Sequence, residues 1–84
     1  MNLSFSKITN NNNKINFKKE IYVPVDYDSK KDIFKANYKP LDINIESSTG
    51  SKIIDLFTKK FINLYERKDR LELQYTKHIN QIVK

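Results

Sequence analysis

The last 34 residues constrain the fold more than any other stretch of the chain. From Ser51 to Lys84 there is no Pro and no Gly, and apolar side chains recur at steps of three and four residues. This spacing places them along one side of an α-helix. The pattern predicts one continuous amphipathic helix over residues 51–84, about 50 Å long at about 1.5 Å per residue. Its apolar side chains are Ile54, Phe57, Phe61, Leu64, Leu71, Tyr75 and Ile82.

The two ends of this helix differ in their patterns. Ile53, Ile54, Leu56 and Phe57 cover most of the circumference, which predicts that the first two turns are buried. Near the middle, residues 71–76 also alternate between apolar and polar side chains, as a strand would. Helix is favoured there because Leu, Glu, Gln and Lys are good helix formers and no breaker precedes them.

The first 50 residues carry the patterns of strands instead. Apolar and polar side chains alternate over residues 2–9, 15–25 and 41–46, and the Asn-rich stretch Asn10–Asn13 favours a turn. The first two strands should therefore form an antiparallel hairpin. Residues 33–38 fit either a short strand or one helical turn.

Two residues qualify the strand over residues 15–25. Pro24 has no backbone N–H, so the strand should lie at a sheet edge near that residue. Lys19 interrupts the apolar side of the strand, which indicates a bulge or a sheet margin. The polar stretch Asp26–Asp32 is expected to form a loop.

Together these patterns predict an α+β fold in one domain. Residues 1–50 form a small antiparallel sheet, a hairpin plus one further strand, packed on the first half of the long C-terminal helix of residues 51–84. A compact chain of this length is only about 30 Å across, so the distal half of the helix should extend beyond the body. Its apolar side chains would then lack cover from the chain and would bind a partner. The predicted partner-binding residues are Leu71, Tyr75, Ile79, Ile82 and Val83.

The charge allows a second kind of partner. The net charge is +6, and residues 51–84 contribute +4 of it. Such an excess suits nucleic acid, an acidic protein surface or anionic lipid. Lys outnumbers Arg fourteen to two, however, and abundant Ile and Asn point to AT-rich codons, so a simple solvated surface is the competing interpretation. The candidate nucleic-acid-binding residues are Lys59, Lys60, Arg67 and Arg70.

No set of residues suggests catalysis or a cofactor. The chain has no Cys and a single histidine, His78, so the usual ligand sets for a metal ion are missing. Residues 47–52 (SSTGSK) lack the spacing of a phosphate-binding loop. No apolar run approaches the length of a membrane span. We therefore expect no enzyme activity, no metal and no cofactor.

The leading functional hypothesis is a small basic structural or accessory subunit. It would dock into a larger assembly, such as a phage or viral particle or a ribonucleoprotein, through its distal helix and an exposed strand edge. Its partner would be another protein or a second copy of the chain. One alternative is a nucleic-acid-binding or regulatory module, and another is a small phage-type inhibitor of a host protein. The expected location is the cytoplasm or the interior of such an assembly, because no secretion signal is recognisable.

Overall fold

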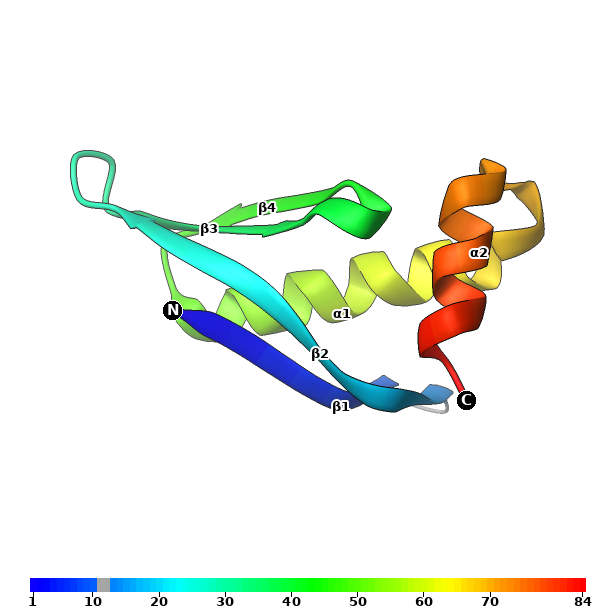
Figure 1. Ribbon diagram of the computed structural model, residues 1–84. Helices are drawn as coiled ribbons and strands as arrows, with labels where there is room; N and C mark the ends of the chain where they lie inside the picture. The colour runs from blue at the N-terminus through cyan, green and yellow to red at the C-terminus, as the bar shows by residue number, and fades with distance from the viewer. Residues whose placement is uncertain (11–12) are drawn as a thin grey trace.

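The computed structural model describes residues 1–10 and 13–84, which form an antiparallel sheet of four strands and two α-helices (Figure 1). The strands lie in the order β1-β2-β3-β4, and the α+β class is as predicted. Within the predicted turn Asn10–Asn13, residues 11 and 12 lie outside the described residues. The elements are β1 (Asn2–Asn10), β2 (Asn13–Asp28), β3 (Ile33–Tyr38), η1 (Lys39–Leu41), β4 (Ile43–Ser47), α1 (Gly50–Glu66), η2 (Lys68–Arg70) and α2 (Leu73–Ile82), where η marks a 3₁₀ turn.

β1 and β2 form the predicted antiparallel hairpin. The ladder is interrupted in the middle, because Phe5 pairs with Ile21 whereas Lys7 pairs with Asn16. Residues 17–20 of β2 are the additional residues at this irregularity. The bulge expected from the charged side chain at position 19 is therefore confirmed.

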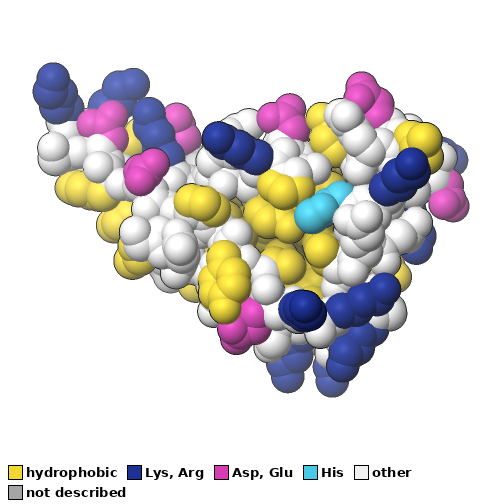
Figure 2. Space-filling view, viewed as in Figure 1, with side chains coloured by type: hydrophobic (Ala, Val, Ile, Leu, Met, Phe, Trp, Pro, Cys, Tyr) yellow, Lys and Arg dark blue, Asp and Glu magenta, His cyan; other side chains and the backbone are white. Residues whose placement is uncertain are grey.

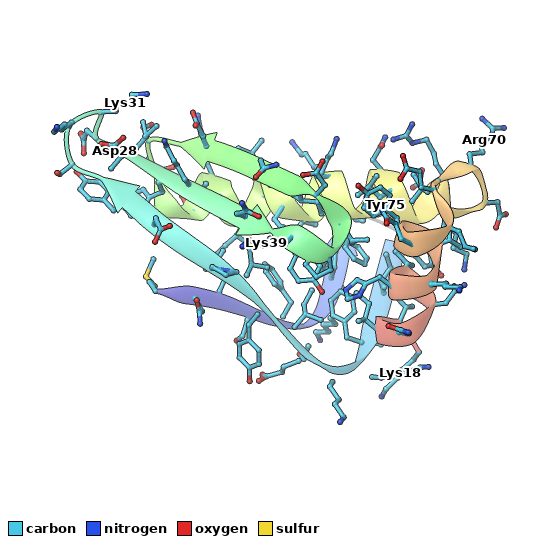
Figure 3. The ribbon with its side chains drawn as sticks, turned by 45° about the horizontal axis from the view of Figure 1, so that its top comes forward. Lys18, Asp28, Lys31, Lys39, Arg70 and Tyr75 are labelled. Atoms are coloured by element: carbon cyan, nitrogen blue, oxygen red, sulfur yellow. The ribbon has the colours of Figure 1, made fainter. Side chains whose placement is uncertain are left out.

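β2 is longer than predicted. The expected loop over Asp26–Asp32 begins only after Asp28, because residues 26–28 pair with β3. The Asp28 carboxylate accepts hydrogen bonds from the backbone N–H groups of Lys30 and Lys31, at 3.0 and 3.3 Å. This local bonding closes the hairpin between β2 and β3, whose tip projects from the rest of the molecule (Figures 1 and 3).

Residues 33–38, for which a strand and a helical turn were both open, form β3. Strand pairing decides between them, because β3 is hydrogen-bonded to β2 on one side and to β4 on the other. The strand predicted over residues 41–46 begins later, at Ile43. Pro40 lies in the preceding η1 turn, which is closed by a hydrogen bond of 3.0 Å from the Asp42 N–H.

The prediction of one continuous helix over residues 51–84 is wrong. α1 ends at Glu66, η2 follows, and α2 begins at Leu73 and crosses the end of α1 towards β2 (Figure 1). The longest dimension of the molecule is 39 Å. It is shorter than the helix of about 50 Å that the sequence predicted, so the expectation that residues 51–84 extend beyond the body is wrong as well.

The turn between the helices lies where the apolar pattern is interrupted. Residues 66–70 are all charged, so this stretch would offer no apolar side chain for burial if the helix continued through it. The Thr76 hydroxyl donates to the Lys68 carbonyl at 2.6 Å and joins α2 to η2. Full burial of a large aliphatic side chain is worth roughly 1.5–3 kcal/mol. The returning α2 gains this term, because Ile79 is 0% exposed.

α1 packs against one face of the sheet, as predicted for the first part of the helix (Figure 1). Ile53, Phe57 and Phe61 are fully buried. Ile54 and Leu56, which were also expected to be buried, are 44% and 40% exposed. The sheet covers only one side of the helix, so the first turns are not enclosed on all sides.

α2 is fastened to β2 at its C-terminal end. Val83 forms an antiparallel bridge with Phe17, and the Lys84 N–H donates to the Asn16 carbonyl at 2.9 Å. With Ile79 in the common core, these bonds make α2 part of the same domain as the sheet.

We predict that Ile79→Ala lowers the free energy of unfolding by about 2–5 kcal/mol, because it leaves a cavity in the core. Leu73→Ala, in the same helix at a side chain that is 68% exposed, is the matched control and should change it by less than about 0.5 kcal/mol. Urea unfolding of both variants measures the difference. Equal stabilities of the two variants would show that α2 is not part of the core.

Candidate functional site

A cleft opens in the sheet where β2 and β3 separate. Their ladder runs from Asp28–Ile33 to Val25–Ala36 and ends there, after which the strands diverge (Figure 1). The cavity between them has a volume of about 490 Å³. This value falls within the range of about 300–1,000 Å³ that is usual for ligand pockets. We call it the β2–β3 cleft, and its lining residues are Tyr22, Pro24, Asp26, Asn37, Tyr38, Lys39 and Pro40.

Pro24 explains why the ladder ends where it does. The Val25 N–H donates to the Met1 carbonyl on the β1 side at 2.8 Å. Backbone groups of successive residues in a strand point to opposite edges, so those of Pro24 point towards β3. The next residue of β3 in register is Asn37. Pro24 has no N–H to donate to it, and the pairing stops. β2 is not an edge strand, because it lies between β1 and β3 in the sheet. Its β3 side is nevertheless unpaired before Val25, so the edge expected near Pro24 is found only locally.

The separation leaves two strand edges facing the cleft. By the same alternation, the backbone N–H and C=O of Tyr22 point to the edge of β2 that lies away from β1. On the β3 side, the backbone groups of Asn37 point towards β2. Those of its neighbours Ala36 and Tyr38 point the other way, towards β4. An open edge of this kind pairs readily with another extended chain.

The inner wall of the cleft is built on a tyrosine–histidine pair. The Tyr38 hydroxyl lies 2.6 Å from Nε2 of His78, so β3 is joined to α2 at this wall. The Tyr38 ring meets Phe57 of α1 edge-on, with centroids 5.9 Å apart. Figure 2 shows apolar side chains gathered on this face, with the histidine among them. The wall is therefore apolar and anchored in the core.

Burial shifts the protonation of both partners. It raises the pKa of the Tyr38 hydroxyl and lowers the pKa of the His78 ring, because each charged form loses hydration. Both groups are thus held neutral near pH 7. The histidine that the sequence left as an isolated side chain is a structural support of the cleft.

A second hollow continues along the open edge of β2. It has a volume of about 300 Å³ and lies between β2 and the end of α2. Lys18 of its lining reaches the Asn80 carbonyl at 3.5 Å. In Figure 3, Lys39 lies at the η1 end of the open edge and Lys18 at the α2 end. The lining residues are Lys18, Lys19, Glu20, Ile21, Gln81 and Ile82.

The five predicted partner-binding residues do not form an uncovered helix end. Ile79 is fully buried, and the other four are partly buried against the core, so the expectation that they lack intrachain cover is wrong. The physical reason is the return of α2 towards β2. The partly buried residues are Leu71, Tyr75, Ile82 and Val83.

The four candidate nucleic-acid-binding residues are all exposed, but they do not form one group. Lys59 and Lys60 lie in α1, and Arg67 caps its C-terminal end. Arg70 lies beyond the helix, in the η2 turn (Figure 3). The structure adds Lys52, an exposed residue of α1 that the sequence reasoning did not include.

The described residues offer neither a metal site nor a membrane-spanning helix. No three or more His, Cys, Asp or Glu side chains are grouped in residues 1–10 and 13–84 as a metal ion would require. In the same ranges, no helix combines the length and the apolar character needed to cross a membrane.

Sequence reasoning missed the β2–β3 cleft because it did not assign β3. The signal was present in Pro24, which interrupts an otherwise alternating strand and marks the point where a neighbouring strand cannot pair. The inward-facing tyrosine at position 38 and its bond to α2 carry no local signal.

We predict that the stability of the protein falls on acidification below about pH 6.5. The unfolded chain titrates His78 near its ordinary pKa of about 6.5, whereas the folded state lowers that pKa. The stabilisation is complete above the unfolded pKa and is lost as the pH falls towards the lowered folded value. His78→Gln, which cannot titrate, should lose less stability between about pH 7.5 and about pH 5. Equal losses in urea unfolding would contradict the prediction.

We also predict that Pro24→Val extends the ladder between β2 and β3. The new backbone N–H can donate to the Asn37 carbonyl, and one such hydrogen bond is worth about 1 kcal/mol. Hydrogen exchange followed by NMR should therefore find the amide at position 24 protected. Tyr22→Val is the control, because it changes a neighbouring side chain without adding a donor. Exchange at position 24 as fast as in an unstructured peptide would show that Pro24 does not cause the separation.

Comparison with known proteins adds no relative to this description. No protein-family model matches the chain, and neither does any curated protein or any solved structure.

Proposed function

We propose that this chain is a small non-enzymatic accessory subunit that docks into a larger assembly by binding an extended segment of a partner protein. The segment occupies the β2–β3 cleft and adds as a strand to the open edge of β2. One observation carries the proposal: Pro24 ends the ladder and leaves backbone hydrogen-bonding groups of β2 directed into a cleft with an apolar wall.

The open edge has a suitable length. It runs from Lys18, next to the bridge made by Val83, to Pro24, where the ladder with β3 begins. At about 3.3 Å per residue this stretch extends for about 20 Å, enough for a segment of about six residues. Strand addition of this type gains affinity from main-chain hydrogen bonds and specificity from alternate side chains.

The lining of the cleft adds apolar contacts to these backbone bonds. Tyr22 stands at the rim and is 58% exposed, so its ring is free to cover a bound side chain. Pro24 and Pro40 present rigid apolar rings on the two sides of the opening. Tyr38 closes the inner wall and is held in place by His78. Aromatic residues in such positions commonly supply much of the energy of an interface.

The proposed docking surface uses a strand edge, as the sequence hypothesis also did, and differs from that hypothesis at the distal helix. The distal segment, now α2, supports one wall of the cleft and contributes Gln81 and Ile82 to the adjoining hollow. A phage or viral particle or a ribonucleoprotein is the assembly that the size and the net charge of +6 suit best. The cytoplasm or the interior of such an assembly is the corresponding location.

An array of synthetic peptides of about eight residues, probed with the full chain, tests the proposal. A bound peptide should protect the Tyr22 amide from hydrogen exchange. N-methylation of the peptide residues that face β2 should weaken binding by about tenfold for each hydrogen bond lost, whereas methylation of the alternate residues should have little effect. Pro24→Val, which narrows the cleft, should also weaken binding.

Three results would contradict the proposal. The first is tolerance of N-methylation at every peptide position, which indicates side-chain docking without strand addition. The second is protection of amides elsewhere on the molecule without protection at Tyr22. The third is self-association in which a second copy of the chain fills the cleft. Sedimentation would then give a mass that rises with concentration, and the Pro24→Val variant would no longer associate.

A further inference from the structure

The outward side of α1 carries a row of basic side chains. Lys52, Lys59, Lys60 and Arg67 are exposed and belong to the helix or to its C-terminal cap. We call these four residues the basic face of α1. The row extends over 15 residue steps from first to last, which corresponds to about 22 Å at about 1.5 Å per residue.

Helical geometry brings the four residues onto one side. Lys52 and Lys59 are seven residues apart, as are Lys60 and Arg67. Seven residues make almost two full turns, so the members of each pair lie one above the other, about 10 Å apart along the axis. The side chains of Phe57 and Phe61 project from the other side of the helix into the core, towards the sheet. The basic face therefore points away from the body of the protein.

Within residues 1–10 and 13–84, no ion pair joins a carboxylate to the basic face of α1. In the described part of the chain, the ion pairs are those of Lys35 with Asp28 and with Glu46, each at 3.9 Å, and neither involves α1. The acidic residues of α1 are Asp55 and Glu66, and both lie at the margin of the basic face. The four cations are thus available to an external anion.

The remaining side chains of this face help to identify that anion. Leu56 and Asn63 lie between the basic residues, and no aromatic residue is among them. A membrane-binding helix would present several bulky apolar side chains beside its cations, and Leu56 alone does not provide them. The two pairs of cations lie side by side along the helix, one on each side of Leu56 and Asn63, and such an elongated basic surface suits a linear polyanion with repeated charges. The lack of aromatic rings removes the stacking platform that reads unpaired bases.

We propose that the basic face of α1 binds the phosphate backbone of nucleic acid without reading its sequence. This activity goes beyond the docking of a protein segment and uses a different surface. α1 lies on one side of the sheet (Figure 1), and the residues of its basic face are exposed, whereas the β2–β3 cleft is lined by residues of β2, β3 and η1. The chain would then join a protein partner to nucleic acid.

The structure also sorts the basic residues near the end of α1. Arg67 caps the helix and continues the row begun by Lys60, whereas Arg70 lies in η2 after the chain has turned. Replacing Arg67 by Gln should therefore weaken binding more than replacing Arg70 by Gln. If only the net charge mattered, and not the position of each residue, the two replacements would weaken binding equally.

The test measures fluorescence anisotropy of labelled DNA of about 20 base pairs and of single strands of the same length, at about 50 and about 200 mM KCl. Four phosphate contacts predict that affinity for the duplex falls by about 100-fold over this range, since the logarithmic slope is about 0.9 for each contact. The variant Lys52→Gln, Lys59→Gln, Lys60→Gln, Arg67→Gln should bind at least about tenfold more weakly at the lower salt concentration and should show a flatter salt slope.

A matched control removes the same charge from other surfaces. Lys14→Gln, Lys19→Gln, Lys30→Gln, Lys31→Gln changes four exposed lysines in β2 and at the hairpin tip and should keep most of the affinity. Circular dichroism checks that both variants remain folded. Equal loss in the two variants, or no binding of either oligonucleotide to the unaltered chain, would overturn the proposal.

Two further probes separate the other polyanions. Poly-glutamate stands for an acidic protein, and vesicles with about 30% anionic lipid stand for a membrane surface. The proposal requires the DNA duplex to bind more tightly than either probe at equal salt. Tighter binding of poly-glutamate or of the vesicles would assign the face to that partner instead and would overturn the nucleic-acid proposal.

Discussion

Phe57 holds together the two halves of a sheet that is only partly joined by hydrogen bonds. β1 and the first part of β2 form one half, β3 and β4 form the other, and the ladder between them covers only residues 25–28 and 33–36. The Phe57 ring stacks on Phe5 of β1 with centroids 5.0 Å apart and meets Tyr38 of β3 at 5.9 Å. The Phe57 side chain therefore connects the two halves of the sheet from the face that α1 covers. Its packing contacts replace the hydrogen bonds that the diverging strands β2 and β3 cannot make.

The contacts of Phe57 explain how the sheet remains stable although β2 and β3 are unpaired at the cleft. Phe61 extends the aromatic packing from Phe57 to Phe17 of β2, with centroid distances of 6.2 and 5.3 Å. α2 closes the remaining side, through Ile79 in the core and the bond between His78 and Tyr38. The rim of the cleft consists of strand edges, and the wall behind it is fixed by residues from both helices. A binding site on such a support needs little rearrangement to receive an extended chain.

The same packing separates the two proposed surfaces. The buried side of α1 faces the aromatic cluster, and its cations lie among the exposed residues of the helix. The cleft lies elsewhere, where the ladder between β2 and β3 ends. Leu56, at 40% exposed, is the apolar residue that this division leaves among the cations. A small chain with a protein-binding edge and a polyanion-binding helix would suit an adaptor in an assembly that contains nucleic acid.

The sequence by itself determined the local elements. Alternating side chains marked β1 and most of β2, the missing N–H of Pro24 marked a local sheet edge, and the apolar stripe through Phe57 and Phe61 marked the buried side of α1. These features depend on neighbours in the chain, which sequence patterns report. Only the tertiary structure decided that residues 33–38 form a strand and that the helix ends at Glu66, because pairing with β2 and β4 and the burial of Ile79 involve residues far apart in sequence. The cleft was hidden for the same reason: it exists only where β2, β3 and η1 meet.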